Sequence, residues 1–554
     1  MTITKINKLK YENKNFIVEI FKKDLQFIIN TTNDFIIVKK YNKFSIYDRK
    51  CDHAGGKILS RRNEHICPMH NWIFFPERGY YNNGVKKKQL DFTEDQDKLY
   101  IKTIKSYPII KTSNKKLPVK IIFFNHAFLQ IKSKNVSFVT DPWALGPAFS
   151  TGWWLKKNTR VDWINSINKS DFIYISHNHP DHLHQMTLKN VNKNKLIITP
   201  KFKSGSVSKL LNDMNFKNIL ELDFDKEYHW DNSELIFSLF KSGDFREDSG
   251  IYFSLGEFKA LLDVDSNNIN FNKLPKVDLY ASSFAGGASG FPLMFENYSI
   301  IQKKNISLKY LMATKAIKNA NLKSIEPKYF LPYAGFFTEK LNRDKFIFKN
   351  NKKNKIKDYA KICENLNINL LDVEKNDEFS FLGSNLIKKR YSKKDRIEDI
   401  DHNKYLITLK AKYKFVDSAY IRSYFENSNF HANLLINVKL SDSYFKKTYY
   451  TFNVNFSKNN IKFVENLLIK NSPKKMRVLN LIVRKESFLS TIYNKSPWED
   501  LLIGFQCKVY REPNEYNVDF WNYFSNIYIS EKMIRTTSPC NNCNILNQKI
   551  DNLL

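Results

Sequence analysis

Long apolar runs are missing from this chain. No stretch of about 18 uninterrupted apolar residues occurs, which argues against a membrane-spanning helix, and residues 1–8 show no apolar signal core. Cysteine is scarce, with six residues among 554, and this usage indicates a reducing compartment. We find no internal repeat. We therefore expect a soluble cytoplasmic protein whose length corresponds to about three domains, with 42% hydrophobic residues to form their cores.

Acidic residues are few compared with basic ones. Lys and Arg number 89 against 56 Asp and Glu, so the formal net charge is +33. Such an excess can mark a nucleic-acid-binding protein, but an Arg-dense stripe is missing and the basic residues are spread along a chain rich in Lys, Asn and Ile. We therefore expect no nucleic-acid partner. A basic surface would instead attract an acidic redox partner or an anionic sugar nucleotide.

The first metal-ligand pattern pairs two cysteines with two histidines. Cys51 and His53 stand two positions apart, and Cys67 and His70 three positions apart. In a Rieske [2Fe-2S] centre two Cys hold one iron and two His hold the other. A tetrahedral zinc knuckle uses the same ligand types, but it usually groups its cysteines together. The alternation of Cys and His therefore favours the Rieske cluster.

The second pattern follows an apolar run at residues 171–176, which has the character of a buried strand. His177, His179, Asp181 and His182 come next, and this spacing is the metal-binding signature of the metallo-β-lactamase superfamily. A polar surface loop is the alternative, but it would rarely concentrate so many of the 11 histidines in a few residues. We expect these four residues to be catalytic metal ligands, with iron favoured and zinc as the other choice.

Two carboxylates are candidates to complete that site. The apolar run 258–264 ends at Asp265, a candidate bridging or supporting ligand. A third metal-binding His is expected between these points, yet residues 241–248 contain none. Asp244 is the candidate in its place, and it would create a site of two His and one carboxylate that leaves positions open for O2.

Several dispersed peptides together resemble the CMP-N-acetylneuraminate hydroxylase family. They span nearly the whole chain from the Rieske pattern onward and comprise residues 141–149 (DPWALGPAF), 152–155 (GWWL), 171–182, 284–292 (FAGGASGFP), 332–335 (PYAG), 502–506 (LIGFQ) and 520–522 (FWN). The family pattern has a His where Asp244 stands, and the Rieske loop here is shorter.

The resemblance implies an iron-sulfur monooxygenase that converts the N-acetyl group of CMP-linked sialic acid to N-glycolyl. It also implies O2 as oxidant and a b-type cytochrome or, in bacteria, a ferredoxin, which receives electrons from an NADH-dependent reductase. Oxygen insertion into a methyl group needs electrons delivered one at a time to an O2-binding metal, which suits a Rieske relay beside a second metal.

The predicted organisation is an all-β Rieske domain, an αββα metallo-β-lactamase-like domain, a C-terminal α+β domain and a tail, at residues 1–110, 115–345, 400–530 and 531–554. Residues 496–502 faintly resemble sterol-carrier-like domains. Within this scheme we expect helices at 207–214 and 463–469, a strand at 405–410, and linkers or solvated loops at 349–355 and 388–394.

Two smaller features stay open at this level. The Gly-rich segment 285–290 would suit either a phosphate-binding loop or a tight structural turn. Cys540 and Cys543 form a single CxxC near the C-terminus, which is either an auxiliary metal or redox site or an inert tail, and the tail is favoured.

Three functions remain open from the sequence. The leading one is the sugar-nucleotide monooxygenase. The second is a phosphodiesterase- or amidase-type metallohydrolase with a redox-sensing Rieske module, and the third is an electron carrier with a vestigial second site. A hydrolytic site with two zinc ions would require the third His as a ligand, whereas an O2-binding iron site accepts a carboxylate in its place.

Overall fold

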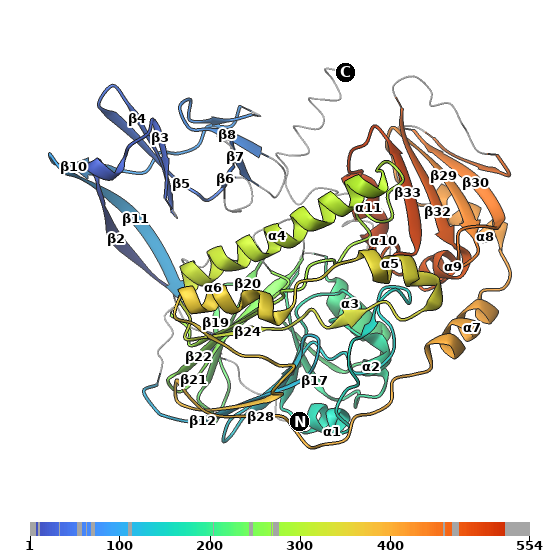
Figure 1. The fold of residues 1–554 in the computed structure, drawn as a ribbon, viewed down its shortest axis with the longest axis horizontal. Coiled ribbons are helices and arrows are strands. Elements are labelled where there is room, and N and C mark those ends of the chain that lie inside the picture. The colour runs from blue at the N-terminus through green and yellow to red at the C-terminus, as the bar shows by residue number, and fades with distance from the viewer. Residues whose placement is uncertain are drawn as a thin grey trace.

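The chain forms three β-rich units, drawn mainly in blue, cyan to yellow, and orange to red in Figure 1. The computed structural model describes residues 7–8, 11–32, 34–52, 58–61, 64–67, 72–82, 84–108, 113–202, 204–242, 247–266, 269, 276–457, 460–467 and 476–526. Among the helices in these ranges, none is long and apolar enough to span a membrane.

The N-terminal unit consists of small antiparallel sheets. Its strands are β2 (Tyr11–Phe21), β3 (Ile29–Thr31), β4 (Phe35–Lys40), β5 (Lys43–Asp48), β6 (Leu59–Arg61), β7 (Glu64–Cys67), β8 (Trp72–Phe75), β9 (Tyr80–Tyr81), β10 (Phe92–Glu94) and β11 (Lys98–Pro108), with the short helix η1 (Lys22–Asp24). Strand β4 lies between two cores, because Ile36 and Val38 pack into one and Phe35 and Ile37 into the other. The alternating runs therefore form the antiparallel sheets that we expected.

The central unit is built from two eight-stranded sheets. The first has the order β1 (Asn7–Lys8), β19 (Glu227–His229), β20 (Leu235–Lys241), β21 (Ser249–Leu255), β22 (Phe258–Val264), β23 (Leu279–Ser282), β24 (Tyr329–Pro332), β26 (Asn369–Leu370). The second has the order β18 (Asn218–Leu222), β17 (Leu196–Pro200), β16 (Phe172–Tyr174), β14 (Ser137–Thr140), β13 (Phe128–Lys132), β12 (Pro118–Asn125), β27 (Glu378–Leu382), β28 (Asn385–Arg390).

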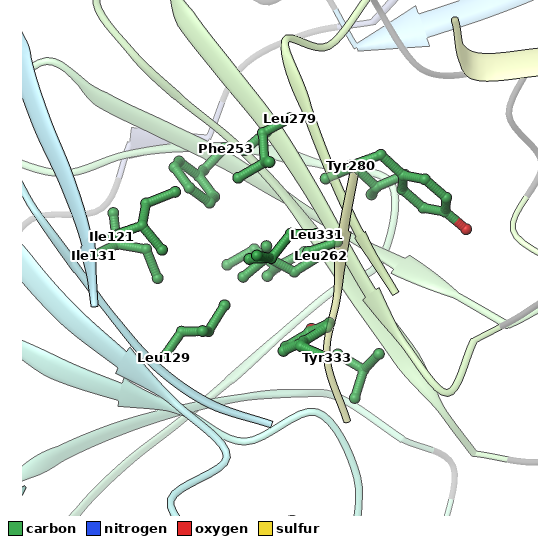
Figure 2. Close-up of a cluster of buried hydrophobic side chains, with 14 of the residues drawn as sticks. Ile121, Leu129, Ile131, Phe253, Leu262, Leu279, Tyr280, Leu331 and Tyr333 are labelled. Atoms are coloured by element: carbon green, nitrogen blue, oxygen red, sulfur yellow. The ribbon is translucent and has the colours of Figure 1, made fainter. Parts of the chain in front are cut away.

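The main core lies between these two sheets. Figure 2 shows Ile121 and Leu129 from the second sheet pointing toward Leu262 and Leu331 from the first. Helices cover the outer faces: α1 (Trp163–Lys169), α2 (Gln185–Lys189) and α3 (Ser206–Asp213) on the second sheet, and α4 (Ile300–Ile325), η4 (Ile356–Tyr359) and α6 (Ala360–Asn365) on the first. The layers are therefore α, β, β and α, as the sequence predicts.

A smaller set of elements lies beside the sandwich and leads toward the C-terminal unit. They are β15 (Trp154–Leu155), β25 (Phe337–Thr338), η3 (Asn342–Asp344), α5 (Lys345–Asn350) and α7 (His402–Lys412). The C-terminal unit has one five-stranded sheet and four helices: β29 (Leu434–Ser441), β30 (Thr448–Phe456), β31 (Ile461–Glu465), β32 (Arg477–Arg484), β33 (Cys507–Glu512), α8 (Ser418–Glu426), α9 (Lys485–Tyr493), α10 (Glu499–Ile503) and α11 (Val518–Asn526).

Some predicted elements differ from those in the structure. The expected helix at 207–214 is α3, but the expected strand at 405–410 lies inside the helix α7, where partly buried positions 402, 405, 406 and 409 recur with helical spacing. The expected helix at 463–469 begins as the strand β31, because this segment pairs with β30 and its Phe463 packs into the sheet's core. At 463–469, tertiary pairing therefore outweighs the local pattern.

The expected linkers also belong to folded parts. Residues 388–390 lie in the edge strand β28, where exposed lysines suit a sheet edge. In 349–355, Asn351 is buried and donates hydrogen bonds to the carbonyl of Gly287 and to Glu339, which also pairs with Lys353 at 2.8 Å. The two sheets of the central unit therefore continue past the predicted end at residue 345. In segment 285–290, Gly286 and Gly287 have φ of 67° and 70°, which lie in the left-handed region that glycine favours.

A buried ion network joins the central and C-terminal units. Arg343 on η3 pairs with Glu486 on α9 at 2.6 Å, and Arg484 pairs with Asp344 at 2.7 Å. The side-chain oxygen of Gln506 accepts hydrogen bonds from both arginines. All five residues are buried. Because a buried charge without its partner is costly, this network holds the two units in one relative position.

We expect Arg343→Met to lower the free energy of unfolding by about 3–5 kcal/mol, because it leaves Glu486 charged and buried without its arginine. The matched control is Arg477→Met, which removes a partly exposed pair with Asp519 and should cost about 1 kcal/mol or less. Urea denaturation of both variants measures the difference. Equal losses would show that the network does not hold the units together.

Candidate functional site

The histidine loop begins where the central strand β16 ends. Strand β16 is buried and runs parallel to β14 on one side and β17 on the other, so its carboxyl end opens at the same edge as theirs. The loop then delivers His177, Asp181 and His182 to buried positions, while the side chain of His179 is 15% exposed. The structure thus shows the predicted order, a buried strand followed by the loop that carries the histidines.

A first ligand group consists of His177, His179 and Asp248. Nε2 of His177 lies 2.9 Å from Nδ1 of His179 and 3.9 Å from a carboxylate oxygen of Asp248. One donor atom from each of the three residues lies within 4.8 Å of the others, which is close enough to hold one ion. Asp248 directly precedes β21, so the first sheet of the sandwich supplies this carboxylate.

A second ligand group consists of His126, Asp181 and His182. One oxygen of Asp181 lies 3.0 Å from Nε2 of His126 and 3.4 Å from Nε2 of His182. Asp265 lies between the groups, because it forms a further cluster of donor atoms with His177 and His182. Its carboxylate is 3.7 Å from Nε2 of His182. The arrangement offers two adjacent cation positions with Asp265 in reach of both.

The second group has the features of a cation site. Oδ1 of Asp181 and Nε2 of His182 are buried without a hydrogen-bond partner, and unpaired buried polar atoms are rare unless a ligand or ion completes them. Burial would raise the pKa of Asp181, but the neighbouring His182 and His126 outweigh it and hold the pKa well below its usual range. The donor set of imidazoles and carboxylates suits iron, zinc or manganese.

Asp141, which directly follows β14, orients the histidine loop through hydrogen bonds. Its carboxylate accepts hydrogen bonds from the backbone N–H and the hydroxyl of Ser176, both at 2.7 Å, and lies 3.0 Å from Nδ1 of His182. The Ser176 hydroxyl uses its only hydrogen to donate to Asp141, so its oxygen accepts a hydrogen bond from Nδ1 of His177 at 2.9 Å. Both imidazoles therefore present Nε2 to the ligand cluster.

His184 belongs to the same loop but has a structural role. Its Nδ1 accepts a hydrogen bond from the backbone N–H of Thr187 and caps helix α2, while Nε2 donates to the carbonyl of Pro147 at 3.1 Å. The ring also stacks on Trp143. Burial lowers the pKa of His184 to about 4, so the ring is neutral at neutral pH.

The structure brings five of the predicted residues together, namely His177, His179, Asp181, His182 and Asp265. Asp244 lies outside the described residues. Sequence reasoning missed His126 and Asp248. The available signal was their position beside apolar strands, because His126 directly follows β12 and Asp248 directly precedes β21.

The N-terminal pattern is described only in part. Cys51 and Cys67 are buried in one small core with Trp72 and Tyr81, whereas His53 and His70 lie outside the described residues. Lys87 is buried beside this core and pairs with Asp48 and Asp52. The two cysteines thus lie in the same small core. Cys540 and Cys543 also lie outside the described residues.

Comparison with known proteins agrees with the fold of the central unit. Residues 120–247 match the family model described as a beta-lactamase superfamily domain. Together with the αββα layers and the histidine loop, this defines the central unit as a metallo-β-lactamase-like domain.

The whole chain is similar to curated proteins named cytidine monophosphate-N-acetylneuraminic acid hydroxylase. The relative from Xenopus laevis is 27% identical over 92% of this chain and 91% of its own length, and the mouse relative is 26% identical over 91% and 93%. The resemblance seen in the sequence is thereby confirmed, and these relatives are enzymes by name. Among solved structures, a diiron beta-hydroxylase from Streptomyces venezuelae is 13% identical, covers 48% of this chain and 54% of its own, and has a TM-score of 0.32, too low to support an argument.

We expect His182→Ala and His184→Ala to separate the two roles of histidine in this loop. His182→Ala should abolish metal retention, because it removes a donor atom at the centre of the cluster. His184→Ala should retain the metal but lower the free energy of unfolding by about 1 kcal/mol, the typical cost of a lost helix cap. Elemental analysis and thermal unfolding of both purified variants test this, and equal metal content in the two would contradict the assignment.

Proposed function

We propose that this chain is an iron-sulfur monooxygenase that hydroxylates the N-acetyl group of a CMP-linked sialic acid. The observation that carries the proposal is the pair of ligand groups around Asp265 in a chain similar, over 91–92% of its length, to hydroxylases named for that substrate. The similarity spans all three units, so it includes the parts that would bind the substrate and receive electrons.

The ligand sets favour iron at this centre. The first group, with two histidines and the carboxylate of Asp248, is the set that leaves coordination positions open for O2 and substrate in non-haem iron oxygenases. Asp265 would bridge to a second ion held by the second group. Bound iron would supply the O2 activation that the hydroxylation of a methyl group requires.

The protein's own residues set the geometry around that centre. Asp141 and Ser176 keep His177 and His182 in the tautomer that offers Nε2. The burial of His177, Asp181 and His182 excludes bulk water, which protects a reactive oxidant from side reactions.

The N-terminal unit would supply electrons one at a time. We assign a Rieske [2Fe-2S] cluster to Cys51, His53, Cys67 and His70, with the two described cysteines already buried in one core. The reductant would be a b-type cytochrome or a ferredoxin that is reduced by an NADH-dependent reductase. The net charge of +33 favours an acidic carrier and an anionic nucleotide substrate, because opposite charges speed encounter.

The metallohydrolase is the competing function, because one fold can serve many chemistries. The carboxylate of Asp248 in the first ligand group favours the oxygenase, since a hydrolytic dizinc site would usually have a third histidine at this metal.

We expect the purified protein, loaded with iron and its cluster, to add one labelled oxygen to the N-acyl group of CMP-N-acetylneuraminate. The reaction contains an electron-donating system and isotopically labelled O2, and mass spectrometry follows the product. Cys67→Ser should abolish turnover while the second metal stays bound. A cluster that is reduced and reoxidised normally without oxygen gain would contradict the proposal and favour hydrolysis.

A further inference from the structure

Helix α10 of the C-terminal unit lies against the metal site. The indole N–H of Trp153 in the central unit donates to the carbonyl of Ile503 at the end of this helix, at 3.2 Å. The backbones of Gly152 and Gly504 touch so closely that a Cβ on Gly152 would lie 2.0 Å from the carbonyl oxygen of Gly504. A side chain at position 152 would not fit, so the close packing of α10 against the central unit requires glycine there.

Glu499, the first residue of α10, faces the outer nitrogen of His179. Its carboxylate oxygen lies 3.5 Å from Nε2 of that ring. The other ring nitrogen, Nδ1, faces His177 within the first ligand group. The two nitrogens of His179 therefore have separate partners, one within the metal site and one in the C-terminal unit.

This arrangement matches what a metal-binding histidine requires. Such a histidine usually donates its free ring N–H to a carboxylate or carbonyl, which fixes the tautomer and the ring direction. His182 has such a partner in the carboxylate of Asp141, and His177 donates to the hydroxyl of Ser176, both in the central unit. For His179 the corresponding carboxylate comes from the C-terminal unit.

The neighbouring Asp500 shows that α10 is not placed for packing alone. Its side chain is buried, and Oδ1 has no hydrogen-bond partner. Burial and the adjacent Glu499 raise the pKa of this carboxyl well above its usual range, while His179 acts in the opposite direction. Burying an unsatisfied carboxyl is costly, so this position of α10 is not the one that stability alone would favour.

We propose that the C-terminal unit completes the metal centre and that Glu499 is a positioning residue, which holds Nε2–H of His179 so that Nδ1 faces the metal. This rests on the proposed function, because it takes the first ligand group to be a metal site. The start of α10 is itself anchored, since the backbone N–H of Glu499 donates to the hydroxyl of Ser525 on α11 at 3.0 Å. The Glu499 side chain is 38% exposed, so water competes for the contact and a moderate effect is expected.

The test is a cobalt(II) titration of the full-length protein, followed by visible absorption, with the wild type and Glu499→Ala compared. Loss of the carboxylate should weaken cobalt binding about tenfold, the lower end of the usual effect of such partners, and shift the absorption band. Glu499→Gln keeps an acceptor oxygen and should restore most of the affinity. Glu515→Ala, an exposed site in the same unit, is the matched control and should bind as the wild type does.

Wild-type affinity and an unchanged band in Glu499→Ala would overturn the proposal. Equal loss in the Ala and Gln variants would also overturn it, because a general disturbance of α10 would then explain the effect. The Rieske signal of the reduced cluster should be the same in all variants. A wild type that binds no cobalt at His177 and His179 would instead refute the metal centre itself, so the two failures are distinguishable.

Discussion

The buried carboxylate of Asp141 is the contact on which the site depends. It stands directly after a strand of the second sheet and binds Ser176 twice and His182 once, so it orders the loop that follows the neighbouring strand. Through the Ser176 hydroxyl its effect reaches His177 as well. One carboxylate therefore sets the tautomers of a histidine in each ligand group, and the position of both groups follows from the pairing of β14 with β16.

The candidate centre combines contributions from both sheets and from a separate unit. His126 and the histidine loop come from the second sheet, Asp248 and Asp265 from the first, and Glu499 from the C-terminal unit. The core between the sheets and the buried ion network at the unit boundary keep these elements in register. A change that loosens the packing between the sheets would therefore also disturb the geometry of the site.

The fold alone does not select a reaction. One fold can serve several chemistries, so the reaction depends on the ligand types at the site and on the units that accompany the domain. Here carboxylates join each histidine group, and a unit with two buried cysteines, Cys51 and Cys67, precedes the domain. Those two features, together with the similarity to named hydroxylases, support the proposed monooxygenase.

The sequence by itself determined what depends on short spacing: the strand before the histidine loop, and the grouping of His177 with His182. It also named His182 as a candidate ligand and left out His184, and the contacts of the two rings agree with that choice, because His184 caps helix α2 whereas His182 lies in the candidate ligand groups. Ligands far apart in the chain, such as His126 and Asp248, were decided only by tertiary structure, since strand pairing brings distant residues to one sheet edge. The expected strand at 405–410 is instead part of helix α7, because a short apolar run does not by itself distinguish a strand from a helix.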